Sequence, residues 1–158
     1  MPKEDAIFCT DKYLRSFRNC PDNPSMTLHQ WRSELWNKAL PEPYRFLTDQ
    51  IYELWLKNRY HYLQLPDNLL QMLKQLRKNY LLAIITNGPS AAQWEKVHQL
   101  NLSELFDCIL VSADFPFEKP DPKIFLAACQ VLRVAPENCI MVGDKLETDI
   151  QVNTNRNK

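Results

Sequence analysis

Three short apolar runs in the second half of the chain constrain its fold more than any other feature of the sequence. They lie at 80–86 (YLLAIIT), 108–112 (CILVS) and 139–142 (CIMV), and helical patterns at about 90–100 and 121–132 separate them. Short apolar runs that end in turn residues are typical of strands buried in a parallel sheet. The alternation of strand and helix therefore predicts an α/β layer with a mainly parallel sheet.

The first half of the chain has a different pattern, in which apolar residues recur three and four positions apart. This spacing predicts helices at about 5–17, after a capping residue at Thr27, and at about 44–63, with a loop at 20–25. Pro66 opens a fourth helix. We therefore expect a helical cap domain at 1–65, a partial α/β domain at 66–151 and a polar tail at 152–158.

Charge and composition exclude several classes of function. The 19 basic and 19 acidic residues cancel, so no net field would attract nucleic acid or an anionic membrane. No apolar stretch reaches the roughly 18 residues that span a bilayer. The five cysteines form no Cys-x-x-Cys pair, which favours reduced thiols and a cytoplasmic location. Only two glycines, Gly88 and Gly143, occur in 158 residues, so the position of each requires an explanation.

Polar and charged residues follow the expected strands at the ends where parallel sheets bind their ligands. A hydroxyl, backbone N–H groups and an ammonium suit a phosphate, and carboxylates suit Mg²⁺. A glycine also lets the backbone approach an anion closely. The candidates are Thr86, Asn87 and Gly88 after the first run, Lys119 in the connection before the second helix, and Gly143, Asp144, Glu147 and Asp149 after the third run.

Each of these residues also has an ordinary structural interpretation. Thr86 and Asn87 are common at the end of a strand and the start of a turn. Lys119 could be an exposed loop lysine. The acidic residues from Asp144 to Asp149 could form the solvated first turn of a helix, where the helix dipole favours them. The order and placement of the residues together favour a phosphate and metal site more than any one of them does.

Three segments in this order resemble motifs of the haloacid dehalogenase superfamily of phosphohydrolases. AIITNG resembles its second motif, EKPDPKIF its third and MVGDKLETDI its fourth. The resemblance implies a Rossmann-like parallel sheet with an α-helical cap, and Mg²⁺-dependent hydrolysis of a phosphomonoester. It assigns Thr86, Asn87 and Lys119 to the substrate phosphate, Lys119 also to catalysis, and Asp144 with its acidic companion Asp149 to the metal. Gly88 joins the expected phosphate site through its backbone.

Within the superfamily, the cap and the run VGDKLETDIQ resemble the phosphatases of sialic acid metabolism most. The resemblance implies a small phosphorylated sugar as substrate and a cap that closes over it. We expect a monomer or weak self-association. A different small phosphorylated substrate is the alternative within the same superfamily.

The sequence departs from the family pattern at both ends. Family members open with a strand ending in Asp-x-Asp-x-Thr, whose first Asp attacks phosphorus, whereas no two of the ten aspartates here stand two apart. The tail VNTNRNK replaces a glycine-rich turn. We therefore expect a truncated, weakly stable chain that lacks the first strand of the sheet and is inactive alone. The alternative function is a non-catalytic product that binds phosphate or a full-length homologue.

Overall fold

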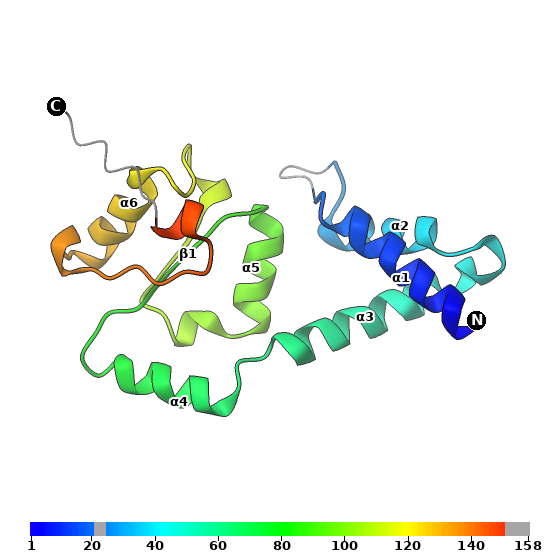
Figure 1. Ribbon diagram of the computed structural model, residues 1–158, viewed down its shortest axis with the longest axis horizontal. Coiled ribbons are helices and arrows are strands. Elements are labelled where there is room, and N and C mark those ends of the chain that lie inside the picture. Colours follow the sequence, from blue (N-terminus) through cyan, green and yellow to red (C-terminus); the bar gives the residue numbers. More distant parts are fainter. Residues whose placement is uncertain (21–24, 151–158) are drawn as a thin grey trace. The chain divides into compact units, whose positions relative to one another are not determined.

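The computed structural model describes residues 1–20 and 25–150. The chain divides into two compact units, Met1–Gln64 and Leu65–Lys158 (Figure 1). The loop expected between 20 and 25 lies mostly outside the described residues, and so does the tail expected at 152–158. No helix in the described part of the chain is long and apolar enough to cross a membrane.

The first unit is entirely helical in its described residues. Its elements are α1 (Lys3–Phe17), α2 (Leu28–Ala39), the 3₁₀ turn Glu42–Leu47 and α3 (Thr48–Leu63). Thr27 caps α2 as expected: its hydroxyl accepts from the Gln30 N–H, and the Gln30 side chain accepts from the Thr27 N–H. The helix expected at 44–63 begins at Thr48 instead, because the residues before it form the tighter 3₁₀ turn, which Pro41 precedes and Pro43 helps to start.

Aromatic rings fill the core of this unit. Tyr13 on α1 and Trp36 on α2 are both buried and stack with their centroids 4.0 Å apart. Tyr52 on α3 joins the same cluster, and Trp55 packs against it. Tyr62, near the end of α3, lies outside this core and is 83% exposed.

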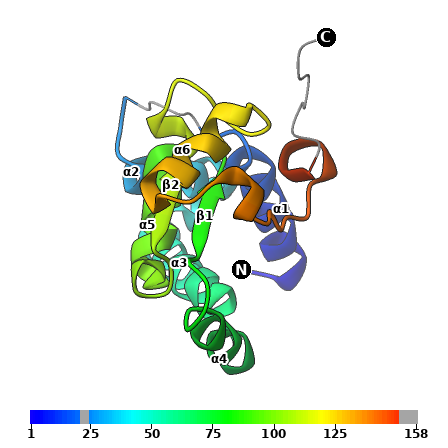
Figure 2. The same ribbon diagram turned by 90° about the vertical axis from the view of Figure 1, so that its left-hand side faces the viewer.

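The second unit holds a small parallel sheet. After α4 (Asp67–Leu76) the chain forms β1 (Ala83–Thr86), α5 (Ser90–Gln99), β2 (Cys108–Val111) and α6 (Pro122–Leu132). β1 and β2 pair in parallel, with Ala83 opposite Cys108 and Thr86 opposite Val111. The core lies between β2 and α6, and contains Cys108, Leu110, Ile124 and Ala128 (Figure 2). The parallel α/β layer expected from the sequence is confirmed.

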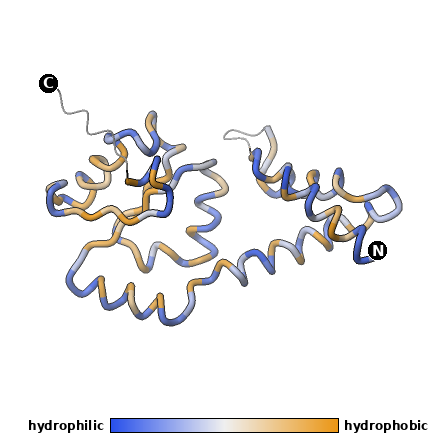
Figure 3. The backbone as a smooth tube through the Cα atoms, viewed as in Figure 1, coloured by the Kyte–Doolittle hydropathy of each residue, from blue (hydrophilic) through white to orange (hydrophobic). Residues whose placement is uncertain are grey.

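The prediction of a third strand at 139–142 is wrong. Among the described residues the sheet has two strands, and 139–142 pairs with neither. This stretch is hydrophobic throughout (Figure 3), yet Ile140 is 91% and Val142 86% exposed. An apolar run becomes a strand only where a neighbouring strand accepts and donates its backbone hydrogen bonds. The described residues supply no such neighbour for 139–142.

β1 also differs from the expectation in length and burial. It begins at Ala83 rather than Tyr80, and none of its residues is fully buried, whereas three of the four β2 residues are. Leu82, the residue before β1, donates its N–H to the Asp107 carboxylate at 2.8 Å instead of to a strand. β1 has one strand partner among the described residues, so its second edge lacks the neighbour that would bury it.

Candidate active site

The carboxyl end of β1 and the loop before α6 lie together in the second unit. Thr86 is the last residue of β1, and Asn87 and Gly88 form the turn that leads into α5. The loop between Ser112 and α6 brings Lys119 to the same place. The structure therefore assembles four of the sequence candidates, Thr86, Asn87, Gly88 and Lys119, around one strand end.

Asn87 is the residue that holds this assembly. Its Nδ2 donates to the Lys119 carbonyl at 2.9 Å, and its Oδ1 accepts from the Lys119 N–H at 3.1 Å. The same Oδ1 accepts from the Ser112 hydroxyl at 2.6 Å. The amide thus fixes the backbone on both sides of Lys119 to the end of the sheet. The Asn87 side chain is therefore engaged by the protein itself, and it serves to anchor the loop.

Thr86 and Gly88 are both in contact with Gln93, one turn into α5. The Thr86 hydroxyl donates to Gln93 Oε1 at 3.2 Å, and Gln93 Nε2 donates to the Asn87 carbonyl at 3.2 Å. Gly88 has a φ of +122°, and a Cβ there would lie 2.6 Å from Gln93 Nε2. The turn therefore requires glycine, because other residues rarely adopt this φ. It places the Thr86 hydroxyl near the N-terminus of α5, where the helix dipole favours an anion.

Lys119 is not an exposed loop lysine. Its Nζ lies 2.7 Å from Asp149 Oδ1, and the two side chains are only 12% and 5% exposed. Asp149 also accepts from the Lys145 N–H at 3.1 Å and from the Thr148 hydroxyl at 3.2 Å. The Lys119 hydrogen bond is the main reason that the pKa of Asp149 lies below its usual value, and the other two donors act in the same direction.

The second glycine has a packing role. The Asp149 side chain lies against Gly143 so closely that a Cβ at Gly143 would overlap its carboxylate. Gly143 therefore lets the turn Leu146–Ile150 fold back onto the chain and carry Asp149 to Lys119. Gly143 thus makes room for a candidate side chain, Asp149, and Gly88 for Gln93, which was not among the candidates.

Asp144, by contrast, is exposed, and it makes no hydrogen bond or ion pair within the described residues. Glu147 is exposed too. No group of three or more His, Cys, Asp or Glu side chains is arranged to hold a metal in residues 1–20 and 25–150. The oxygen donors nevertheless suit Mg²⁺, which usually keeps several waters and takes only one or two protein carboxylates. The Asp144 carboxylate has no partner in the described residues. Asp149, which the sequence also assigned to the metal, is paired with Lys119.

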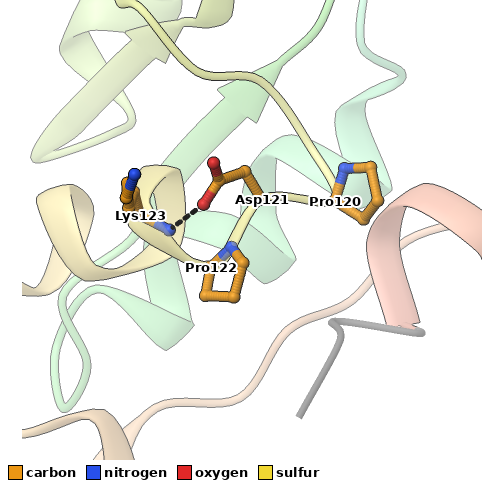
Figure 4. Close-up of a pocket in the computed structure, with 4 residues that line it drawn as sticks. All are labelled: Pro120, Asp121, Pro122 and Lys123. Atoms are coloured by element: carbon orange, nitrogen blue, oxygen red, sulfur yellow. Dashed lines mark hydrogen bonds between the residues drawn. The ribbon is translucent and has the colours of Figure 1, made fainter. Parts of the chain in front are cut away.

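A shallow hollow of about 470 Å³ lies beside Lys119, on the first turn of α6. It is lined by Pro120, Asp121, Pro122 and Lys123 (Figure 4). Asp121 caps α6, since its Oδ1 accepts from the Lys123 N–H at 2.9 Å. The peptide bond between Lys119 and Pro120 is cis. The proline-rich segment EKPDP therefore shapes the loop that presents Lys119.

Ser112 and Gln93 belong to this site and were not predicted from the sequence. Ser112 is 2% exposed and directly follows β2, which was a usable signal because parallel strands end at the same edge. Gln93 is an ordinary helical residue in the sequence, and nothing marked it. Its role depends on the turn at Gly88, which brings the helix back over the strand end.

Comparison with known proteins identifies the family. Residues 19–153 match the haloacid dehalogenase-like hydrolases. The chain is similar to the N-acylneuraminate-9-phosphatases of Mus musculus and Homo sapiens, with 36% and 34% identity over 94% of its length. It is also 36% identical over 59% of its length to a glyceraldehyde 3-phosphate phosphatase of Methanopyrus kandleri. The chain spans 62% of the length of the two N-acylneuraminate-9-phosphatases.

A solved structure supports the same assignment. The crystal structure of a haloacid dehalogenase phosphatase from Thermococcus onnurineus is 29% identical and superposes with a TM-score of 0.57. The match covers 89% of this chain and 60% of that one. The parallel α/β unit with a helical cap is therefore the fold expected from the three motifs. The chain belongs to the haloacid dehalogenase-like hydrolases.

Proposed function

We propose that the chain is part of a Mg²⁺-dependent phosphatase that releases phosphate from a phosphorylated sugar, with sialic acid 9-phosphate as the substrate. One observation carries the proposal: Asn87 ties Lys119 to the strand end that also presents Thr86. The identity of 36% with an N-acylneuraminate-9-phosphatase, over 94% of the chain, supports the choice of substrate. The free cysteines of the described residues suit a reducing, cytoplasmic location.

The chemistry required is mainly positioning and charge compensation. Phosphoryl transfer spreads negative charge over the oxygens of the transferred group, and fixed donors that meet this charge supply much of the rate enhancement. The Thr86 hydroxyl and the Lys119 ammonium are such donors. Asp144, with Asp149 beside the Lys119 ammonium, would hold Mg²⁺, which would supply positive charge to the phosphate oxygens.

The nucleophile is the missing part of the proposal. The family pattern places it in an Asp-x-Asp motif, and this sequence has none. Lys119 and Thr86 bind and polarise a phosphate but do not attack it. We therefore propose that the chain by itself binds a phosphorylated ligand without turning it over.

The test is phosphate release from sialic acid 9-phosphate in the presence of Mg²⁺. The chain alone is compared with a version that carries an added N-terminal strand ending in Asp-x-Asp-x-Thr. Turnover by the extended version, and its loss in the same version with Lys119→Met, supports the proposal. Lys119→Arg is the matched control, since it keeps the charge. Turnover by the unextended chain would overturn the claim that the nucleophile lies outside it.

A second candidate function is a non-catalytic chain that binds a full-length homologue. The open edge of β1 and the exposed Ile140 and Val142 favour it, because an edge of this kind pairs readily with another strand. Size-exclusion chromatography of the chain with human N-acylneuraminate-9-phosphatase distinguishes the two functions. A stable complex supports this second candidate, and separate elution at micromolar concentration contradicts it.

A further inference from the structure

Two cysteine thiols meet outside the candidate active site. Cys129 lies in the last turn of α6, Cys139 follows the 3₁₀ turn Pro136–Asn138, and their Sγ atoms are 3.7 Å apart. Cys129 is half-buried and Cys139 is exposed. They are ten residues apart in the sequence, so no spacing motif marked them as a pair.

The backbone between the two cysteines keeps them together. Arg133, which follows α6, has the left-handed conformation, and the Val134 N–H donates to the Cys129 carbonyl at 3.0 Å. The following turn is closed by the Cys139 N–H, which donates to the Pro136 carbonyl at 3.1 Å. The Cys139 thiol also points back, toward the Ala135 carbonyl at 3.5 Å. The turn after α6 therefore brings Cys139 back beside the last turn of the helix, where Cys129 lies.

We propose that Cys129 and Cys139 are a dithiol site that forms a reversible disulfide by exchange with glutathione disulfide. A sulfur–sulfur bond is about 2.0 Å long, so the two atoms must approach by roughly 1.7 Å. Cys139 is on extended backbone with its side chain in solvent, which leaves room for that rotation.

The exchange takes place in two balanced steps. The Cys139 thiolate attacks one sulfur of glutathione disulfide, the glutathione S–S bond breaks, and one glutathione thiolate leaves. Cys129 then loses its proton and attacks the Cys139 sulfur of the mixed disulfide, which releases the second glutathione thiolate. The two cysteines lose two electrons and two protons, and two molecules of reduced glutathione carry them away.

The order of the steps follows from the surroundings of the thiols. Burial raises the pKa of Cys129, and the hydrogen bond with Cys139 raises it further. Cys129 is therefore the poorer first nucleophile, while Cys139 is open to an oxidant. An exposed attacking thiol beside a half-buried resolving thiol is the arrangement that exchange requires.

The disulfide would restrain a segment that the sheet does not hold. Cys139 starts the unpaired stretch 139–142, which leads directly to Gly143 and Asp144. A covalent link to α6 fixes the start of that stretch. If the proposed metal role of Asp144 holds, oxidation changes how freely this carboxylate reaches the site; the disulfide itself depends only on the two thiols.

The direct test uses the positions of the basic residues. Trypsin cuts after Lys123, Arg133 and Lys145, which places Cys129 in peptide 124–133 and Cys139 in peptide 134–145. The chain is equilibrated with glutathione disulfide, alkylated, digested and analysed by mass spectrometry without reductant. The expected product is the two peptides joined, lighter than their sum by two hydrogens and separated by dithiothreitol.

Variants, internal controls and hydrogen exchange complete the test. Cys129→Ser should stop at a glutathione adduct on Cys139, and Cys139→Ser should leave Cys129 largely as a thiol. The buried Cys9 and Cys108 serve as internal controls and should stay reduced. In the unmutated chain, glutathione adducts on Cys139 without the joined peptides, or no modification of either residue, would overturn the proposal. Hydrogen exchange in peptide 134–145 should slow on oxidation, a readout that is independent of any phosphatase activity.

Discussion

Lys119 Nζ and Asp149 Oδ1 form a 2.7 Å ion pair that is nearly shielded from solvent, although the residues are 30 positions apart. The sequence assigned Lys119 to a phosphate and Asp149 to a metal. In the structure the two groups neutralise each other. A phosphate that draws Lys119 away therefore frees Asp149 for a cation, and a cation on Asp149 frees Lys119 for a phosphate. Within the proposed function, the two ligands should strengthen each other's binding.

This ion pair predicts an acid-dependent loss of stability. Because the folded-state pKa of Asp149 is lowered, its contribution is present above the unfolded pKa and is lost as the pH falls through the folded pKa. Asp149 in the unfolded chain titrates near 3.8. We expect Lys119→Met to lower Tm at pH 6–7, and the difference from the unmutated chain to shrink at pH values below about 4.

Thermal melts of both chains between pH 7 and 3 measure this difference. Asp144→Asn is the matched control, because Asp144 is exposed and unpaired in the described residues, and it should leave the pH profile unchanged. A difference between Lys119→Met and the unmutated chain that stays constant down to pH 3 would show that Asp149 does not carry the effect.

Local signals in the sequence located most of the elements but not the contacts between them. The cap at Thr27 and the proline at position 66 marked the starts of α2 and α4, because capping and proline act within one turn. β1 and β2 followed from their apolar runs. The pairing of Lys119 with Asp149 could not be predicted, since it depends on how the turn at Gly143 folds back on the chain.

The stretch 139–142 shows that an apolar pattern alone does not determine whether a strand forms. Its four residues read CIMV and are as apolar as β2. A strand, however, is defined by hydrogen bonds to a neighbour, and that neighbour is not a property of the stretch itself. The same reasoning explains Asn87: its residue type suggested a turn or a phosphate contact, and only the folded loop shows that it anchors Lys119.

Asn87 should therefore be essential for the architecture of the site. Asn87→Ala leaves the Ser112 hydroxyl and the backbone of Lys119 without their partners. A buried polar group without a partner costs about 1–3 kcal/mol, so we expect the free energy of unfolding to fall by about 2 kcal/mol or more. Ser112→Ala removes one of the three hydrogen bonds and should cost less. Urea denaturation measures both, and an equal loss in the two variants would contradict the anchoring role.

Gly88 gives a prediction in which backbone and side-chain effects separate. Gly88→Ala should destabilise the chain by about 1–2 kcal/mol, since alanine is strained at a φ of +122°. The new Cβ also meets Gln93 Nε2, but that atom ends a flexible side chain and can move away. The double variant Gly88→Ala, Gln93→Ala should therefore recover little of the loss. Full recovery in urea denaturation would assign the penalty to the side-chain clash instead.

Because the stretch 139–142 is unpaired, we predict that the chain is weakly stable and that charged residues in this stretch reduce its aggregation. Ile140 and Val142 are 91% and 86% exposed, so their side chains contribute little to the core. Within the described residues β1 pairs only with β2, so its other edge is open. We expect a Tm below about 50 °C, toward the lower part of the mesophile range. Ile140→Lys together with Val142→Lys should change the free energy of unfolding by less than about 0.5 kcal/mol, because the side chains are already in water. The same change should lower light scattering on heating, since it removes exposed apolar surface next to an open edge.

Ile124→Lys is the contrasting control: Ile124 is fully buried in the core between β2 and α6, and its replacement should unfold the chain. Differential scanning calorimetry with parallel light scattering measures the unmutated chain, the double variant and Ile124→Lys. A large destabilisation by the double variant at 140 and 142 would mean that these side chains are packed in solution and that the stretch has found a strand partner.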